Sequence, residues 1–540
     1  MRSRWFLLMA LTAGVVMMAF LWYTASRSSE AVRPQPGGTY IEGVAGAPSR
    51  INPLFASFNA VDGDLTALIF SGLTRLGLDG EVLPDLAESW DISEDGLTYT
   101  FRLRAGVSWH DGEPFGADDV IFTIEAIRDA DFRGEPSLGD LFRSLSATKI
   151  DDLTVEITLV QPFAPFLAYA SVGILPAHLL AGLSASELYN DLFNQRPVGT
   201  GPFRLVDLSG EQAILESYPT YHLGEPYINR LELRFYADDS RLLRALKDGD
   251  LQGAFFRSYL NTEDRLYLES EEQWESVKLS SSAYTILYLN NDYPPFADER
   301  VRQALAYATD RDQIVSSLME GQAVRVDSPI PAETWAYYPA LDRYRFDLDQ
   351  AARLLDEAGW LLQPNGVRVK DGQELRFTLV TNEEGTRIAV AEEMVRSWSA
   401  IGVQATVRTE KPTNLLRDTL MPRQFEAALY GFDSGLDPDP YPTWHSSQIG
   451  AGGGNLAGFV DAHADAVLEE ARQASDPRRR AALYREFQEV FAQELPSLPL
   501  FQRTFSYIVD KRLLGVETTG VLFDSGSRFS LVRQWHMESN

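Results

Sequence analysis

The segment TYTFRLRAGVSWHDGEPFGADDV, residues 98–120, begins with the pattern of a strand and ends with the pattern of a helix. Apolar residues occupy every second position from Tyr99 to Leu103, which predicts a strand with one buried face. The pair Asp111-Gly112 favours a turn. From Asp118 onward the apolar spacing becomes that of an amphipathic helix, and Asp118 is a suitable helix cap. We therefore predict strand, turn and helix in succession.

One histidine, His110, lies directly before this turn. No second histidine, hydroxyl or cysteine with the context of a nucleophile lies nearby, so a catalytic role for His110 is disfavoured. We expect His110 to brace the turn.

The same alternation of elements continues along the chain. Residues 153–160 and 228–236 have the period of two that is typical of strands, and residues 298–309 have helical spacing. Two further helices are predicted to begin after the caps Asp461 and Asp476. This alternation predicts an α/β fold.

Length and composition narrow the class of protein. A chain of 540 residues is expected to form two or three domains. The formal net charge of -29 disfavours binding to nucleic acid or to an anionic membrane surface. Cysteine is absent, which excludes thiolate chemistry, disulfides and a lipid-modified cysteine at the N-terminus.

The N-terminal segment, residues 1–30, predicts export. Arg2 and Arg4 precede the uncharged apolar run Trp5–Tyr23, which is long enough to cross a bilayer. It is either a cleaved signal or an uncleaved anchor; we favour the anchor because a good small-residue cleavage site is missing. Residues 31–38, AVRPQPGG, are predicted to form a tether, and the rest of the chain is expected outside the cytoplasm.

Known catalytic and metal-binding patterns are missing from the sequence. The six histidines show no pair at the spacing of a zinc protease, and no Gly-x-Ser-x-Gly motif occurs. The glycine run near Gly450 lacks the context of a phosphate-binding loop. We therefore predict a protein that is not an enzyme, with no catalytic residue, no metal site and no cofactor.

Several longer blocks occur in a fixed order. LAESW begins at Leu86 and is followed by the segment at 98–120; then come GTGPF at Gly199, PPFADERVRQALAYATDRDQI at Pro294, LLDEAGW at Leu354 and DPDPYPTWHSS at Asp437. With these blocks the chain resembles the family 5 extracellular solute-binding proteins, the peptide, dipeptide and nickel receptors of ABC importers. The resemblance spans nearly the whole mature chain.

This resemblance implies an α/β Venus-flytrap fold, in which two lobes joined by crossing strands close on a ligand. In the three-domain form, the core of lobe I would take residues 39–60, 191–274 and 496–540, and residues 61–190 would form its inserted subdomain. Lobe II would take residues 275–495. GTGPF and DERVRQAL are expected to determine the fold rather than the site.

The resemblance also implies a function. The protein would capture short peptides in the interlobe cleft and deliver them, as a monomer anchored at the cytoplasmic membrane, to the permease subunits of an ABC importer. Peptide main chains would pair with the cleft in the manner of an added strand. The same fold could instead bind an oligosaccharide, a nickel chelate or an opine, or sense peptides for signalling, and an extracytoplasmic hydrolase is a more remote alternative.

Candidate ligand-binding residues follow from the resemblance. Asp433 is the best match for the aspartate that pairs with the α-ammonium of the peptide, and Phe432 stands where the family usually has Trp. Phe58, Asn59 and Trp444 lie in segments that line the cleft in relatives. For each of these residues a helix cap, a loop position or core packing is the competing interpretation.

Overall fold

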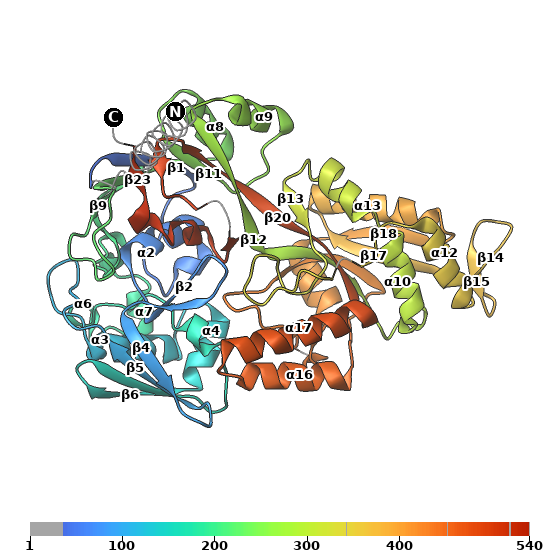
Figure 1. The fold of residues 1–540 in the computed structure, drawn as a ribbon, viewed down its shortest axis with the longest axis horizontal. Coiled ribbons are helices and arrows are strands. Elements are labelled where there is room, and N and C mark those ends of the chain that lie inside the picture. Colours follow the sequence, from blue (N-terminus) through green and yellow to red (C-terminus); the bar gives the residue numbers. More distant parts are fainter. Residues whose placement is uncertain (1–35, 342, 451, 518–519, 539–540) are drawn as a thin grey trace, which may run out of the picture.

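The structure of the protein, a computed structural model, describes residues 36–341, 343–450, 452–517 and 520–538. The predicted signal or anchor at 1–30 and most of the predicted tether at 31–38 lie outside these residues. Within the described ranges, no helix combines the length and the apolar character needed to cross a membrane. Figure 1 shows two bodies connected by two long strands.

The connecting strands are β12 (Trp274–Leu289) and β20 (Ser497–Asp510), which pair antiparallel at the centre of one large sheet. The strands of one body continue the sheet from β20: they are β11 (Gly253–Phe256), β1 (Thr39–Ala45), β10 (Arg230–Tyr236), β9 (Gln212–Ser217) and β8 (Phe203–Leu208). The strands of the other body continue it from β12: they are β19 (Ala427–Asp433), β17 (Arg376–Asn382) and β18 (Gln404–Glu410). The predicted α/β architecture of two lobes joined by crossing strands is confirmed.

A separate four-stranded antiparallel sheet lies within the range predicted as an inserted subdomain. Its order is β4 (Ala87–Ile92), β5 (Thr98–Leu103), β7 (Thr154–Thr158) and β6 (Ser146–Asp151). Tyr99, Phe101 and Leu103 of β5 are buried, as their alternation predicts. One hydrophobic cluster joins this sheet to β1 and β10. The exact limits of the subdomain and the lobes remain a prediction.

Helix starts follow local capping. The helices α10 (Glu299–Tyr307), α16 (Ala462–Gln473) and α17 (Pro477–Glu494) begin after the aspartates at 298, 461 and 476, whose carboxylates accept amide hydrogen bonds of the first turn. The predicted cap Asp118 is wrong, because α3 (Ala117–Arg128) begins after Gly116 and Asp118 pairs instead with Lys149, at 2.9 Å.

The remaining elements complete the chain. They are α2 (Ala60–Ile69), β2 (Thr74–Leu76), β3 (Val82–Pro84), α4 (Pro136–Arg143), α5 (Phe166–Tyr169), α6 (Ala177–Leu180), α7 (Ala185–Leu188), α8 (Asp239–Lys247), α9 (Thr262–Ser270), α11 (Arg311–Gln313), β13 (Ala323–Arg325), α12 (Leu348–Glu357), β14 (Leu361–Leu362), β15 (Arg368–Lys370), β16 (Gln373–Glu374), α13 (Gly385–Ser399), α14 (Pro412–Asn414), α15 (Tyr441–Trp444), β21 (Leu513–Leu514), β22 (Val521–Leu522) and β23 (His536–Met537), with short 3-10 and π turns between them.

Helices cover both faces of the sheet that contains β17 and β19. Apolar residues of α10, α12 and α13 form one hydrophobic cluster with these strands, and residues of α16 and α17 form another on the opposite face. Figure 1 shows α16 and α17 packed side by side next to the body that contains β5. The sheet is thus held between two layers of helices, which keep the ends of β17 and β19 in place.

His110 connects the opening segment to the GTGPF block. Its backbone amide donates to the Gly199 carbonyl at 2.9 Å, its Nδ1 accepts from the Gly199 amide at 3.3 Å, and its Nε2 lies 3.0 Å from the Gly201 carbonyl oxygen. Nε2 therefore carries the ring proton. Burial lowers the pKa of His110 to about 4, so the ring is neutral at pH 7. The expected bracing role is confirmed.

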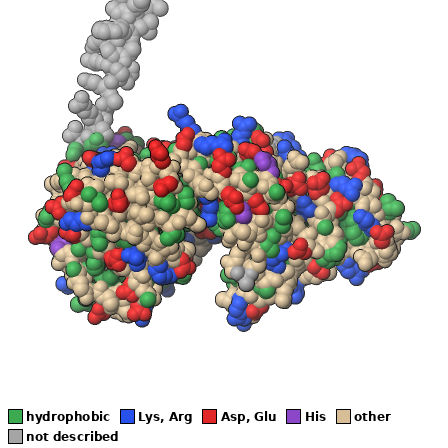
Figure 2. Space-filling view, turned by 90° about the horizontal axis from the view of Figure 1, so that it is seen from below, with side chains coloured by type: hydrophobic (Ala, Val, Ile, Leu, Met, Phe, Trp, Pro, Cys, Tyr) green, Lys and Arg blue, Asp and Glu red, His purple; other side chains and the backbone are tan. Residues whose placement is uncertain are grey.

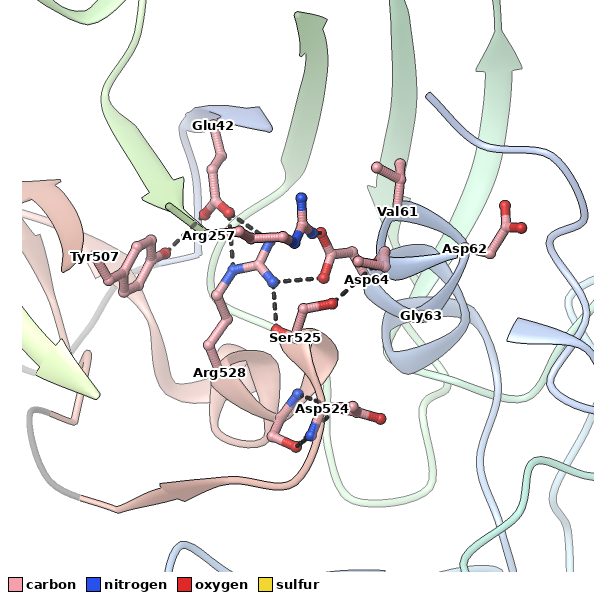
Figure 3. A network of polar contacts seen from close by, with 12 residues as sticks. Glu42, Val61, Asp62, Gly63, Asp64, Arg257, Tyr507, Asp524, Ser525 and Arg528 are labelled. Atoms are coloured by element: carbon pink, nitrogen blue, oxygen red, sulfur yellow. Dashed lines mark hydrogen bonds and ion pairs between the residues drawn. The ribbon is translucent and has the colours of Figure 1, made fainter. Parts of the chain in front are cut away.

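A buried ionic network ties the C-terminal segment to the first strand (Figure 3). Arg528 contacts Glu42 at 2.7 Å and Asp64 at 2.6 Å, and none of the three side chains is exposed. Arg257 reaches Asp64 at 2.6 Å, and the Tyr507 hydroxyl donates to Glu42 at 2.7 Å. Burial alone would raise the pKa of Asp64, but the two arginines hold it below its usual value. These contacts join β1, α2 and the segment after β22.

Candidate ligand-binding site

A deep cleft separates the two bodies in Figure 2. The bodies also contact each other outside the crossing strands. The Ala164 amide donates to the Arg472 carbonyl at 2.7 Å, and the Trp335 amide donates to the Asp79 carbonyl at 2.9 Å. The Arg472 guanidinium also lies 5.1 Å from the centre of the Phe163 ring.

Asp433 is the last residue of β19, at the edge where the parallel strands β17 and β19 end. In open α/β sheets this carboxyl edge is where ligands bind. The Asp433 carboxylate is exposed and accepts hydrogen bonds from the Ser282 hydroxyl at 2.9 Å and from the Gly435 amide at 3.1 Å. It forms no ion pair within the described ranges, so its charge is available to a ligand.

Phe432 lies beside this carboxylate. Its half-buried ring packs edge-on against Tyr284 of β12, with 5.3 Å between the ring centres. Tyr284 itself is buried, and its hydroxyl donates to the Pro329 carbonyl at 2.9 Å. Phe432 thus offers an apolar surface next to the charge of Asp433.

Arg387 is a neighbour that the sequence analysis missed. It lies in the first turns of α13, and its guanidinium carbon is 5.3 Å from the centre of the Tyr430 ring. A Cβ atom on Gly431 would come within 2.7 Å of Arg387 Nη2, so the lack of a side chain at Gly431 lets the guanidinium lie this close to the strand. The Arg387 guanidinium of α13 therefore lies beside Gly431, two residues before Asp433 on β19, and its Nε is 3.9 Å from Glu384 Oε2. No sequence motif marked Arg387, because the contact depends on the position of α13.

Asn382, at the end of β17, adds a polar group to the same edge. Its side chain is buried, and its Oδ1 has no hydrogen-bond partner among the residues that the structure describes. Such an acceptor can bind a donor of the ligand or an ordered water.

The structure gives Phe58 and Asn59 different surroundings. Phe58 is 63% exposed, in a 3-10 turn before α2. Asn59 is the N-cap of α2: its Oδ1 accepts from the Val61 amide at 2.9 Å, and its Nδ2 donates to the Ala47 carbonyl at 3.0 Å. The side chain of Asn59 thus serves to cap α2, whereas the exposed ring of Phe58 can contact a ligand.

Trp444 is placed in the core and not in the cleft. Only 1% of its surface is exposed, and its ring packs against Phe491 at 4.7 Å and Tyr288 at 6.3 Å between centres. The prediction that Trp444 contacts ligand conflicts with this burial, so we leave it out of the site.

The Asp-Pro-Asp-Pro stretch after Asp433 serves the fold. Asp437 forms two hydrogen bonds of 2.6 Å with Arg480 of α17, and Asp439 accepts from Arg472 of α16 at 2.7 Å. Burial raises the pKa of Asp437, although Arg480 opposes this. Because both carboxylates are paired, they are not available to a ligand.

Metal ligands do not gather in this region. In the part of the chain that the structure covers, no group of three or more histidine, aspartate or glutamate side chains is arranged to hold a metal ion. The arrangement of Asp433, Arg387 and Phe432 instead suits an organic ligand that carries both charges.

Comparison with known proteins identifies the family of this chain. The family model described as "Bacterial extracellular solute-binding proteins, family 5 Middle" matches residues 81–454. The oligopeptide-binding protein AppA of Bacillus subtilis (strain 168) is 29% identical over 520 residues, which cover 92% of this chain and 93% of that protein. Protein XP55 of Streptomyces lividans is 32% identical over 482 residues, 88% of this chain and 85% of that protein.

Solved structures have the same fold. The structure of AppA from Bacillus subtilis in complex with a nonapeptide covers 94% of this chain and 100% of its own, with a TM-score of 0.67 and 27% identity. HbpA2 from Haemophilus parasuis covers 93% of this chain and 100% of its own, with a TM-score of 0.80 and 27% identity. The chain belongs to family 5 of the bacterial extracellular solute-binding proteins.

Proposed function

We propose that this protein captures short peptides in the cleft between its lobes and delivers them to an ABC importer. The observation that carries the proposal is the exposed, unpaired carboxylate of Asp433 at the carboxyl edge of parallel strands, beside Arg387. A peptide carries an ammonium and a carboxylate, so it matches a site with both charges. The oligopeptide-binding relative AppA supports the peptide as ligand class.

Asp433 is the proposed partner of the peptide's α-ammonium. Ser282 and Gly435 orient one carboxylate oxygen and leave the other free. Phe432 provides the apolar surface for the first side chain, and Phe58 is a further candidate contact from the other lobe. The peptide main chain would add to the cleft as an extended strand, a mode that tolerates many sequences.

Lobe closure would convert binding into a signal for the importer. A ligand that touches both lobes binds the closed form more tightly and shifts the population toward it. The contacts of Arg472 and Trp335 with the other body are the places where closure would be completed.

The test is peptide binding by the full chain in detergent, first by native mass spectrometry of the purified protein and then by calorimetry. Asp433→Ala is expected to weaken tripeptide binding about 100-fold or more, because a buried ammonium loses its charged partner. Asp418→Ala, which removes an exposed acid elsewhere, is the control. An affinity within about twofold of the wild type would refute the role of Asp433. A copurified metal chelate or haem instead of peptides would refute the ligand class.

We also propose that residues 1–30 anchor the protein as a monomer on the outer side of the cytoplasmic membrane, where it can meet the permease. The apolar run Trp5–Tyr23 supports this proposal. The mass of the protein isolated from membranes distinguishes a retained segment from a cleaved one.

A further inference from the structure

Arg503 of β20 carries a positive charge that no carboxylate among the described residues neutralises in an ion pair. Its half-buried side chain lies where β20 crosses between the lobes and pairs with β13. Burial lowers the pKa of Arg503, and the carboxylates of Glu384 and Asp239 oppose this from a distance. Both carboxylates accept backbone amides instead, that of Arg387 at 3.2 Å and that of Ser258 at 3.0 Å.

Neutral groups hold the guanidinium of Arg503 in place. Its Nη2 donates to the Arg257 carbonyl at 2.6 Å, and its central carbon lies 4.0 Å from the centre of the Tyr259 ring and 5.2 Å from that of Phe505. Its Nε is buried and has no acceptor in the part of the chain that the structure describes. A buried donor without an acceptor is unfavourable, and a guanidinium binds a carboxylate well through two parallel N–H groups. The charge of Arg503 therefore suits a carboxylate of a ligand.

The strand pairing relates Arg503 to the proposed ammonium site at Asp433. Tyr284 of β12 pairs with Phe432 of β19 on one side and with Gln502 of β20 on the other. Both neighbouring strands run antiparallel to β12 and therefore parallel to each other, so Asp433 and Arg503 follow these two partners in the same direction. Two strand spacings separate Phe432 from Gln502, which is about 10 Å between their backbones.

A bulge of β12 lies between Arg503 and Asp433. The register shift after Ser280 leaves residues 281–283 opposite Arg503 alone. On the other side of β12, Ala283 pairs with Asp433. The same irregular segment thus borders the unpaired cation and the unpaired carboxylate, and bulges of this kind often lie next to functional sites.

We propose that Arg503 forms an anion subsite that binds a carboxylate of the peptide, either at its C-terminus or on an acidic side chain. This inference rests on the proposed function, because Asp433 must take the α-ammonium. An extended peptide advances about 3.3 Å per residue, so about three residues span the 10 Å between the outer strands. Arg387 is a different cation, because its Nε already lies 3.9 Å from the carboxylate of Glu384.

The test uses two pairs of peptides and calorimetry on the full chain in detergent. Ala-Ala-Ala and its C-terminal amide differ only in the C-terminal carboxylate, and the amides of Ala-Glu-Ala and Ala-Gln-Ala differ only in a side-chain carboxylate. The wild type is expected to bind the carboxylate member of at least one pair about tenfold more tightly than its neutral counterpart. Arg503→Gln is expected to lower that ratio about fivefold or more, while the affinity for the amide of Ala-Ala-Ala stays unchanged. The pair whose ratio falls identifies the source of the carboxylate.

Arg503→Lys keeps a positive charge at this position and is expected to keep more of the ratio than Arg503→Gln. An equal loss in both variants would overturn the subsite, because packing against Tyr259 and not charge would then account for the effect. Arg417→Gln is the matched control, since this exposed arginine pairs with Asp418, and it should leave both ratios unchanged.

Two further results separate the subsite from the receptor. Equal binding within both pairs by the wild type, or unchanged ratios in Arg503→Gln, would overturn the subsite and leave the peptide receptor intact. Failure of the wild type to bind any of the peptides would overturn the proposed function together with the subsite.

Discussion

Replacing His110 with glutamine is expected to make folding stability less sensitive to acid. In the folded protein the ring is neutral, accepts from the Gly199 amide and donates to the Gly201 carbonyl. Its pKa falls from 6.5 to about 4, mainly because burial penalises the charged form. Glutamine can still donate a hydrogen bond to Gly201 but does not titrate.

The size of the effect follows from this difference in pKa. Because the folded-state pKa is the lower one, the contribution of His110 to stability is full above pH 6.5 and is lost as the pH falls toward 4. At 1.36 kcal/mol per pKa unit, the complete loss is about 3 kcal/mol, of which about 2.5 kcal/mol is lost between pH 7.5 and 4.5.

The assay is urea unfolding of the wild type and His110→Gln at pH 7.5 and 4.5, followed by the fluorescence of tryptophans such as the adjacent, buried Trp109. Taking the difference between the two proteins cancels the pH-dependent contributions of the carboxylates that both contain. The free energy of unfolding of the wild type should fall by about 2.5 kcal/mol more than that of the variant. Equal losses, or a His110 pKa near 6.5 in a histidine NMR titration, would refute the reasoning.

Two further changes test how the lobes are held. Arg528→Met should lower the free energy of unfolding by about 4 kcal/mol, because Glu42 and Asp64 stay buried without that partner. Urea unfolding at pH 7.5 measures this change, and a loss below about 1 kcal/mol would contradict the prediction. Arg472→Ala removes the contact with the Phe163 ring and the partner of Asp439, so the ligand-free protein should open further. Small-angle scattering should show a larger radius of gyration for this variant but not for Arg417→Ala, which alters an exposed pair.

Features that depend on near neighbours in the chain could be predicted from the sequence. The buried face of β5 follows from alternation, and the starts of α10, α16 and α17 follow from aspartates that bond amides two or three residues ahead. The cap of α3 was misplaced because Gly116, which has no side chain, occupies it while Asp119 bonds back to its amide. The ordered blocks of sequence also identified the family.

The candidate site was predicted only in part. Asp433 and Phe432 lie together at the strand edge because they are adjacent in sequence and the parallel strands end there. The sequence around an aromatic residue such as Trp444 does not distinguish a position in a cleft from one in a hydrophobic core. The packing of Trp444 against Phe491 of α17, which places it in the core, depends on the tertiary structure.

The sequence by itself determined several individual helices and strands, the α/β class and the family, because periodicity, capping and ordered motifs are properties of neighbouring residues. Only the tertiary structure brought Arg387 beside Gly431, and Arg528 to Glu42, a pair separated by 486 positions. The physical reason is that such partners meet only after the intervening strands and helices have packed, so their charges and hydrogen bonds depend on the whole fold.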